Sequence, residues 1–358
     1  MKRTFTLAVV GVALILLADL MYRDPSTQGL VEVNSGFRVV MGTFSRVVVI
    51  AKSQRAAQRC IEAAFDVQNR IESLMSDYRD DSELSKVNRL AAQGPVAVSE
   101  MTFEILQKAV QFSTLSEGAF DVTVGPLVDL WHKAGETDVP PTEEALAEAR
   151  RKVGFDNLIL DEQNRTVRFA VAGMRVDLGG IGKGYAADKA AEAMKEHGAL
   201  GGMVAIAGDI RCFGRPPRGQ ERWRIGVQDP NVAPDDLGPS QPLLVLALTS
   251  EGVSTSGDYR RFVRIQGHKQ SHIMDPGTGR GANRLVSDTI IAPDATTSDA
   301  LSTAVNVLGL EKGLALVERI PGVEAILIPA GKDAHPIFSR GARAYIVPVQ
   351  GAARPDEK

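Results

Sequence analysis

The sequence has few cysteines, with only Cys60 and Cys212 among its 358 residues. Two cysteines cannot build a disulfide framework, and their separation fits no zinc-binding spacing. We therefore expect both in the core, although a single bridge stays open if the compartment is oxidising. A strong charge of either sign is missing too, because the net charge at pH 7 is −3. This balance gives no indication of nucleic-acid binding.

Internal repeats and heptads are also absent from the sequence, and aromatic residues make up only 5% of it. The rest of the composition, with 44% hydrophobic and 24% charged residues, is ordinary for a globular protein. The length allows one large domain or two ordinary ones. Hairpin and helix patterns mix without a regular βαβ rhythm, which predicts an α+β fold of mixed or antiparallel sheets and packed helices.

Hydrophobic periodicity and turn residues indicate where the elements lie. Helices are expected over 54–74, 99–118, 142–154, 185–197, 298–308 and 310–320; strands over 39–51 (bent or paired), 158–160, 166–171, 174–178, 203–207, 223–227, 243–248, 252–256, 261–265, 323–328 and 344–347; and a polar loop over 76–89.

The N-terminus carries Lys2 and Arg3 before an apolar run that extends from Phe5 to Tyr22, interrupted by Asp19. As a helix this run would span about 27 Å, just enough for a bilayer. It has no small-x-small cleavage site and no lipidation box, since the first cysteine is Cys60. Residues 1–23 are therefore expected to be a signal sequence or, preferably, an uncleaved membrane anchor. We expect a linker over 24–36, one domain over 37–348, and a disordered tail over 349–358.

The most informative segment is Asp177-Leu-Gly-Gly-Ile-Gly-Lys-Gly-Tyr-Ala-Ala-Asp188. Its glycines allow close approach to a ligand, and the helix that follows presents free N–H groups at its positive end. Lys183 suits a phosphate, and Asp177 suits a ribose, a ring or a metal. The segment is not a Walker A loop, because Gly184 replaces the Ser or Thr after Lys183, and its glycine spacing does not match a dinucleotide fingerprint. A tight strand-to-helix turn without a ligand remains the alternative.

Two further segments carry candidate chemistry. In Ser298-Asp-Ala-Leu-Ser-Thr303, Asp299 and Thr303 are four residues apart on a predicted helix, so their oxygens face one side, as Mg²⁺ requires. A helix cap at Ser298 or Asp299 is the alternative. In Ser271-His-Ile-Met-Asp-Pro276, His272 lies at a strand end before a turn, a plausible place for a general base. A structural or solvated histidine is the alternative there.

Taken in order, these segments resemble the ApbE family of FAD:protein FMN transferases. The resemblance extends from about Val39 to Gly309. It is carried by Met41-Gly-Thr43, Ser76-Asp-Tyr-Arg-Asp-Asp-Ser-Glu-Leu-Ser-Lys-Val-Asn88, Gly118-Ala-Phe-Asp-Val-Thr-Val-Gly-Pro-Leu127, Asp177 to Asp188, Ser254-Thr-Ser-Gly-Asp-Tyr259, Ser271 to Pro276 and Ser298 to Thr303.

The resemblance implies a single α+β domain that binds FAD and Mg²⁺, moves FMN from FAD onto a threonine hydroxyl of a target protein, and releases AMP. Carried over position by position, it implies His272 as the base and Lys183 at the phosphates. The implied FAD contacts are Met41, Tyr78, Ala119, Phe120, Asp121, Asp177, Lys183 and Ile273, and the implied Mg²⁺ ligands are Asp299, Thr303 and a carbonyl near Gly180.

This sequence departs from the family at several points. Glycines stand at Gly179, Gly180 and Gly182, where the family often has alanines, so this loop is expected to be more flexible. Ala207-Gly-Asp209 replaces a Gly-Gly-Glu turn, which puts a nearby flavin or nucleotide contact in doubt.

Two other functions stay open from the sequence. One is a pyrophosphatase that hydrolyses FAD to FMN and AMP at the same site. The other is a non-catalytic FAD-binding assembly factor. From the family, the expected acceptor is a subunit of a membrane redox complex. The expected location is the bacterial inner membrane with the catalytic domain in the periplasm, or release into the periplasm if the N-terminal segment is cleaved.

Overall fold

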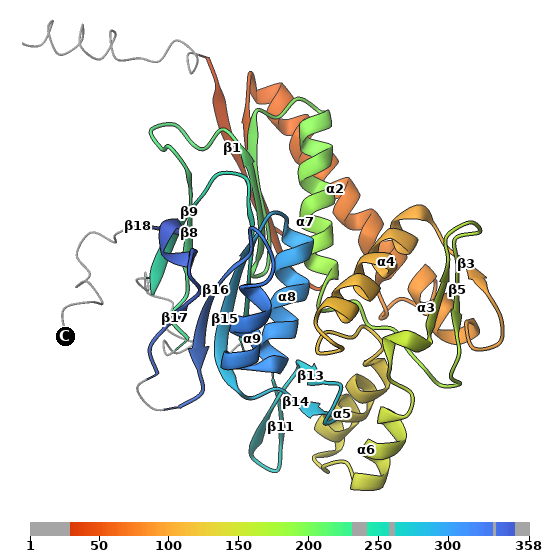
Figure 1. Ribbon diagram of the computed structural model, residues 1–358. Coiled ribbons are helices and arrows are strands. Elements are labelled where there is room, and N and C mark those ends of the chain that lie inside the picture. Colours follow the sequence, from red (N-terminus) through yellow and green to blue (C-terminus); the bar gives the residue numbers. More distant parts are fainter. Residues whose placement is uncertain (1–28, 231–241, 258–261, 332–333, 348–358) are drawn as a thin grey trace, which may run out of the picture.

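The largest element of the computed structural model, which describes residues 29–230, 242–257, 262–331 and 334–347, is a sheet of eight antiparallel strands (Figure 1). In spatial order these are β1 (Val31–Val40), β2 (Thr43–Ala51), β6 (Gly201–Ile206), β7 (Asp209–Gly214), β10 (Gly252–Gly257), β15 (Leu285–Ala292), β16 (Glu324–Pro329) and β17 (Ile337–Phe338). The predicted α+β fold with antiparallel sheets is confirmed.

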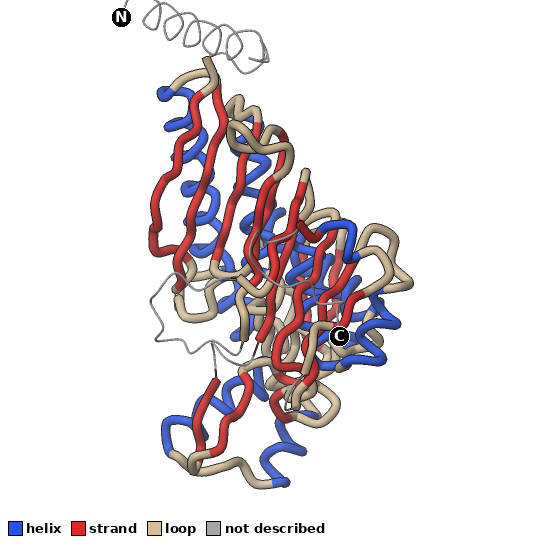
Figure 2. The backbone as a smooth tube through the Cα atoms, turned by 90° about the vertical axis from the view of Figure 1, so that its left-hand side faces the viewer, coloured by secondary structure: helices blue, strands red, loops and turns tan. Residues whose placement is uncertain are grey.

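Helices α2 (Gln54–Met75), α7 (Gly182–Glu196) and α8 (Ala295–Leu308) cover one face of this sheet (Figure 2). Successive side chains of β2 point to opposite faces of the sheet, and both faces are buried. Val47 and Val49 pack into the cluster beneath the helices, whereas Val48 and Ile50 belong to a second cluster on the other face. Each face of the strand thus contributes to a separate apolar core.

A small three-stranded sheet supplies the second core. It consists of β8 (Trp223–Val227), β9 (Leu244–Leu248) and β18 (Ile346–Val347). Trp223 and Leu246 from this sheet pack with Ile291 of the large one. The large sheet is therefore enclosed between two apolar layers, and its central strands hold the turns at their ends in fixed positions.

Most of the remaining elements lie beyond the end of α2 and around α8 in Figure 1, whereas the 3₁₀ helix Ala342–Tyr345 contacts β9 and β16. They are α3 (Glu83–Leu90), α4 (Glu100–Leu115), α5 (Gly125–Thr137), α6 (Glu143–Arg150), α9 (Leu310–Val317), β3 (Val96–Ala97), β4 (Leu158–Asp161), β5 (Thr166–Phe169), β11 (Phe262–Ile265), β12 (His268–Ser271), β13 (Met274–Asp275), β14 (Arg280–Gly281) and two short 3₁₀ helices, Phe155–Asn157 and Ala342–Tyr345.

The expected linker over 24–36 is wrong from Val31 onward, because β1 begins there and pairs with β2. Val31 and Val33 alternate with the exposed Glu32 and Asn34, as in an edge strand with one buried side. The polar residues that alternate with the two valines give this strand the composition of a linker, which explains the wrong prediction. The membrane segment expected over 1–23 and the tail over 349–358 lie outside the described residues. Among the helices of the described ranges, none is both long and apolar enough to cross a membrane.

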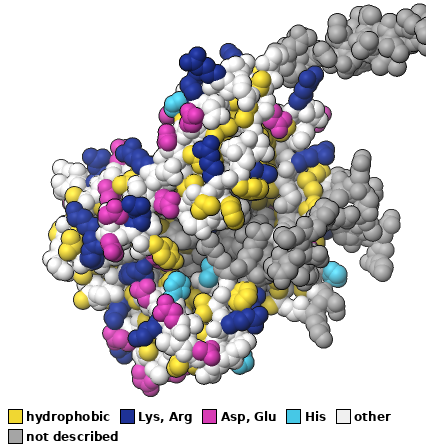
Figure 3. Space-filling model, turned by 180° about the vertical axis from the view of Figure 1, so that it is seen from behind, with side chains coloured by type: hydrophobic (Ala, Val, Ile, Leu, Met, Phe, Trp, Pro, Cys, Tyr) yellow, Lys and Arg dark blue, Asp and Glu magenta, His cyan; other side chains and the backbone are white. Residues whose placement is uncertain are grey.

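Basic and acidic side chains are interspersed on the face of the molecule shown in Figure 3. Such mixing matches the small net charge of the sequence. A face without a dominant charge lacks the electrostatic footprint of a nucleic-acid-binding surface.

Asp288 on β15 is a fully buried carboxyl within this fold. Its oxygens accept hydrogen bonds from Ser302 Oγ at 2.6 Å and from Asn306 Nδ2 at 2.9 Å, both on α8. Burial raises the pKa of Asp288 to about 7 because the charged form loses its hydration. The group therefore binds its proton more tightly in the folded protein than in the unfolded chain.

This raised pKa predicts a pH-dependent stability. The stabilisation by protonated Asp288 is complete below about pH 4 and is lost as the pH rises through about 7. The free energy of unfolding of Asp288→Asn, measured by urea titration, is therefore expected to gain up to about 4 kcal/mol relative to the wild type between pH 4 and pH 8. Parallel pH profiles for the two proteins would contradict this.

Candidate active site

The glycine-rich segment turns an extended stretch into α7. Gly179 N donates to Asp177 Oδ1 at 2.7 Å, and Gly182 N donates to Leu178 O at 2.8 Å. The stretch 174–178 forms only an isolated parallel bridge, from Arg175 to Val124, and the expected strand there is wrong. α7 starts at Gly182 without capping by the side chain of Ile181, its N-cap residue. The first turn of α7 therefore points a positive helix end toward the site.

Lys183 lies in this first turn and contacts two buried carboxylates. Its Nζ is 2.7 Å from Asp209 Oδ2 and 3.4 Å from Asp299 Oδ1. Asp299 Oδ2 in turn accepts a hydrogen bond of 2.9 Å from Gly184 N. Burial, together with the nearby Asp209 carboxylate, raises the pKa of Asp299. The arrangement concentrates one positive and two negative groups at the end of α7.

The position of Asp299 on α8 decides between the two interpretations of its segment. The residue that caps α8 is Asp294, whose side chain accepts from Thr297 N at 2.7 Å. Asp299 lies one turn farther on, buried against α7, with Thr303 four residues later. The helix-cap alternative for Ser298 or Asp299 is therefore wrong. Ser298 instead shares a hydrogen bond of 2.8 Å with Ser254 on β10.

Two glycines allow α8 to approach the turn this closely. A Cβ at Gly180 would lie 2.8 Å from Thr303 Oγ1, and one at Gly184 would lie 2.1 Å from the carbonyl oxygen of Ala295. Both distances are shorter than contacts that real Cβ atoms make. The backbone of the turn thus lies directly against the side chains of Thr303 and Asp299.

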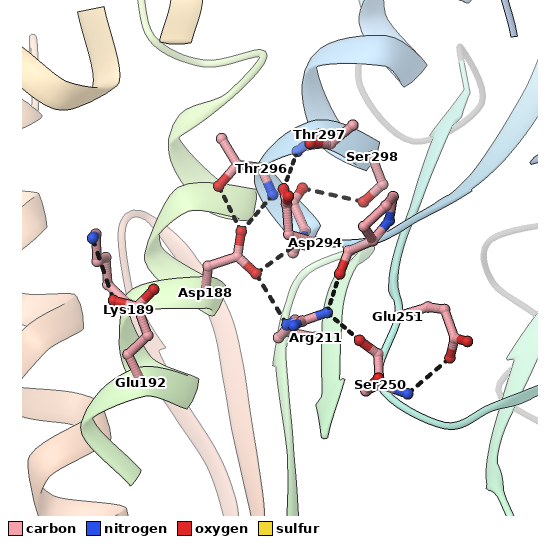
Figure 4. A network of polar contacts seen from close by, with 12 residues as sticks. Asp188, Lys189, Glu192, Arg211, Ser250, Glu251, Asp294, Thr296, Thr297 and Ser298 are labelled. Atoms are coloured by element: carbon pink, nitrogen blue, oxygen red, sulfur yellow. Dashed lines mark hydrogen bonds and ion pairs between the residues drawn. The ribbon is translucent and has the colours of Figure 1, made fainter. Parts of the chain in front are cut away.

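A polar network fixes the start of α8 against α7 (Figure 4). Asp188 accepts hydrogen bonds from Ala295 N at 2.9 Å and from Thr296 N at 2.8 Å. Arg211 on β7 approaches Asp188 Oδ1 at 3.3 Å and donates to Pro293 O at 2.6 Å. Asp188, the last residue of the glycine-rich segment, therefore sets how far α8 extends toward the site.

Several residues implied to contact FAD surround this centre. Met41, in the turn between β1 and β2, has its Cε 3.9 Å from the position of a Cβ on Gly182. Phe120 is buried with its ring edge 3.3 Å from the corresponding position on Gly180. Ala119 and Ile273 pack together with Val307, one turn beyond Thr303 on α8. These four residues come from three segments of the chain, and Met41 and Phe120 lie directly against the turn.

Three other residues implied to contact FAD, Asp121, Asp177 and Tyr78, have different environments. The carboxylate of Asp121 accepts from Thr123 N at 2.7 Å and from Phe155 N at 3.0 Å, so its side chain holds two loops together. Burial raises the pKa of Asp121 and also that of Asp177. Tyr78 is 85% exposed, although its loop is anchored by an ion pair of 2.8 Å between Asp77 and Arg175. Its ring is accessible to solvent.

His272 follows directly after β12 and is exposed, as expected for a residue at a strand end. Its neighbour Ile273 is buried on Val307 of α8. The contact brings the His272 backbone to the end of α8 that carries Thr303. An exposed imidazole at this place is accessible to a substrate that enters from solvent.

The oxygen donors near α8 fit a magnesium ion. Asp299 offers a carboxylate, Thr303 a hydroxyl and Gly180 a backbone carbonyl, all hard oxygen ligands. The ammonium of Lys183 lies 3.4 Å from the Asp299 carboxylate, so this position favours a cation. No cluster of three or more histidine, cysteine, aspartate or glutamate residues suited to a metal occurs in the described ranges. Mg²⁺ needs none, since it takes few protein ligands and completes its shell with water and phosphate.

Asp209 was not predicted as a site residue. In the sequence it belongs to the turn Ala207-Gly-Asp209, which stood out only as a departure from the family pattern. The structure places its carboxylate nearer to Lys183 than that of Asp299. Only the position of β7 between β6 and β10 in the sheet, which no local pattern reveals, brings it there.

Comparison with known proteins gives a family match. The family model described as "ApbE family" matches residues 41–327. The chain belongs to the ApbE family. Its relatives include a FAD:protein FMN transferase of Treponema pallidum (strain Nichols), 36% identical over 305 residues, which cover 81% of this chain and 83% of the relative. A Vibrio cholerae protein of the same name is 36% identical over 282 residues, covering 78% and 82%.

Solved structures from the ApbE family share the fold. The ApbE protein of Thermotoga maritima superposes with a TM-score of 0.77 at 32% identity, covering 88% of this chain and 99% of that one. The flavin transferase ApbE of Vibrio cholerae gives a TM-score of 0.74 at 31% identity with the same coverage. The match covers nearly the full length of both solved structures, so the shared fold corresponds to whole proteins.

Proposed function

We propose that this ApbE-family protein transfers FMN from FAD to the hydroxyl of a threonine in a target protein, with Mg²⁺ at Asp299, Thr303 and the Gly180 carbonyl. The observation that carries this proposal is the Lys183 ammonium between two buried carboxylates at the start of α7. Relatives that cover four fifths of the chain carry the name FAD:protein FMN transferase, which supports the transfer itself.

In this reaction the threonine oxygen forms a bond to the phosphorus on the FMN side of FAD. The bond from that phosphorus to the bridging oxygen breaks, and AMP leaves with that oxygen. His272 takes the proton of the threonine hydroxyl. Lys183, in the first turn of α7, binds the phosphate oxygens and holds them in line for attack. Bound Mg²⁺ would supply additional neutralisation of phosphate charge.

The flavin ring would lie among Met41, Phe120 and the apolar cluster to which Ala119 and Ile273 belong. Tyr78 is exposed beside this region and would close over the ring. Asp121 would position the two loops that it joins, and Asp177 would hold the glycine-rich turn in place. These roles are supported by the positions of the residues and by the resemblance to the family.

We further propose that the protein is held at the bacterial inner membrane by residues 1–23, with its domain in the periplasm, and that the acceptor is a subunit of a membrane redox complex. The apolar run from Phe5 to Tyr22 after two basic residues supports the location. Cell fractionation tests it. Recovery of the full-length chain in the cytosolic fraction would contradict it.

The test of the reaction uses the full-length protein with FAD, Mg²⁺ and an unflavinylated redox-complex subunit as acceptor. We expect AMP, measured by chromatography, and a fluorescent covalent adduct on the acceptor in equal amounts. The same acceptor with its target threonine changed to valine serves as control and should yield no adduct. Unchanged FAD would refute the transfer, and AMP with free FMN but no adduct would indicate hydrolysis in its place.

A further inference from the structure

We propose that Asp209 is a positioning residue that holds the ammonium of Lys183 and thereby keeps Asp299 available for a divalent cation. The inference rests on the proposed function, in which Asp299 is the carboxylate ligand of Mg²⁺. It adds a residue that neither the sequence motifs nor the proposed reaction assigns.

The distances show which carboxylate the lysine prefers. Lys183 Nζ lies 2.7 Å from Asp209 Oδ2, the length of a charge-assisted hydrogen bond, but 3.4 Å from Asp299 Oδ1. The side chains of Asp209 and Asp299 are 7% and 5% exposed, so water cannot neutralise either of them well. One ammonium therefore faces two poorly hydrated carboxylates and is bound mainly to one.

Asp209 is held by the sheet rather than by a loose loop. It starts β7 and lies opposite Ser254 on β10. The preceding turn is fixed as well, because Ala207 N donates to Phe44 O at 3.0 Å and Thr255 N donates to Gly208 O at 3.3 Å. Ala207 has a φ of +53°, a conformation that a non-glycine residue adopts only when its surroundings enforce it. The carboxylate of Asp209 is thus a fixed point for Lys183.

Competition follows from this geometry. If Asp209 loses its charge, the ammonium gains by moving to Asp299, the other carboxylate within reach. A divalent cation then has to displace the lysine before it binds. Asp209→Asn should consequently weaken Mg²⁺ binding, although Asp209 is not itself assigned as a ligand.

A double-mutant cycle on Mg²⁺ affinity tests the inference without any turnover. Mg²⁺ is titrated calorimetrically into the full-length wild type, Asp209→Asn, Lys183→Gln and the double variant, each saturated with FAD. We expect Asp209→Asn to weaken Mg²⁺ binding about 10-fold or more, which equals about 1.4 kcal/mol. We expect the double variant to bind Mg²⁺ within about 3-fold of Lys183→Gln, since no lysine remains to compete. Asp209→Glu, which keeps the charge, should restore most of the affinity.

The alternative is that Asp209 attracts the cation directly by its charge. In that case Asp209→Asn weakens Mg²⁺ binding by the same factor in the Lys183→Gln background as in the wild type. That result overturns the inference. An unchanged affinity in Asp209→Asn, or a wild type that binds no Mg²⁺, overturns it too. Because no acceptor is present, this result is independent of the transfer assay. Absence of adduct formation would refute the proposed function while leaving the cycle interpretable.

Discussion

Asp299→Asn is expected to lower the rate of FMN transfer about 1000-fold while the protein remains folded. Asparagine keeps the size of the side chain and can still accept the hydrogen bond that Gly184 N donates at 2.9 Å. It loses the negative charge, which is what a hard divalent cation requires at this place. Removal of one preorganised charge-stabilising contact costs a factor of this order in other active sites. The rate of adduct formation at saturating FAD and Mg²⁺ measures the loss.

The matched control for this variant is Asp288→Asn. Asp288 is also a fully buried carboxyl, and it also hydrogen-bonds α8, through Ser302 and Asn306. It is not part of the proposed cation site, so its replacement should leave the transfer rate within about 3-fold of the wild type. An equal loss in both variants would mean that the effect comes from disturbed packing of α8. A full rate in Asp299→Asn would exclude Asp299 as the essential ligand.

Gly184→Ala is expected to destabilise the protein by about 3 kcal/mol or more and to lower transfer about 100-fold. The added Cβ would lie 2.1 Å from Ala295 O and 2.7 Å from Asp299 Cβ. The first contact is with backbone, which cannot rotate away, so the two helices must separate. Displacement of Asp299 by even 1 Å is enough for a loss of this order. Urea unfolding and the adduct assay measure the two effects.

Gly182→Ala, in the same helical turn, separates the steric effect from the loss of a glycine. Its Cβ would meet nothing closer than 3.9 Å. Alanine is also a better helix former, so the stability of this variant should be unchanged or higher by up to about 1 kcal/mol. If both variants were equally unstable, close approach of α7 and α8 would not explain the need for Gly184.

The sequence predicted the elements that carry strong local signals. The helical pattern from Gln54 onward and the helix after Ser99 lie where periodicity and caps placed them, and of the two alternatives over 39–51 the strand pair is the one that forms. α3 was missed although Ser82 caps it, because the polar residues around Leu84 and Val87 suggested a loop. β15 was missed because it is buried on both sides and alternates little, and its pairing is entirely with distant strands.

In the candidate site too, residues with a local sequence signal were predicted, and residues whose role depends on distant contacts were not. Lys183, Asp299 and Thr303 lie in segments whose spacing already suggested phosphate and metal chemistry, and α7 and α8 bring these segments together. Asp209 could not be predicted, since its role depends on a sheet register that places β7 beside β10. The function of Asp188 depends likewise on the crossing of two helices far apart in sequence.

The backbone contact at Gly184 has a consequence for how this protein tolerates sequence change. Because Gly184 on α7 lies against the backbone of Ala295 and the Cβ of Asp299 on α8, a larger residue at Gly184 cannot be accommodated by rotation of a side chain. Mutations there should be strongly epistatic. A substitution that is damaging alone becomes acceptable only when Asp188, which holds the start of α8, is changed together with it. Libraries that vary these positions jointly should therefore recover active variants that single-site scanning misses.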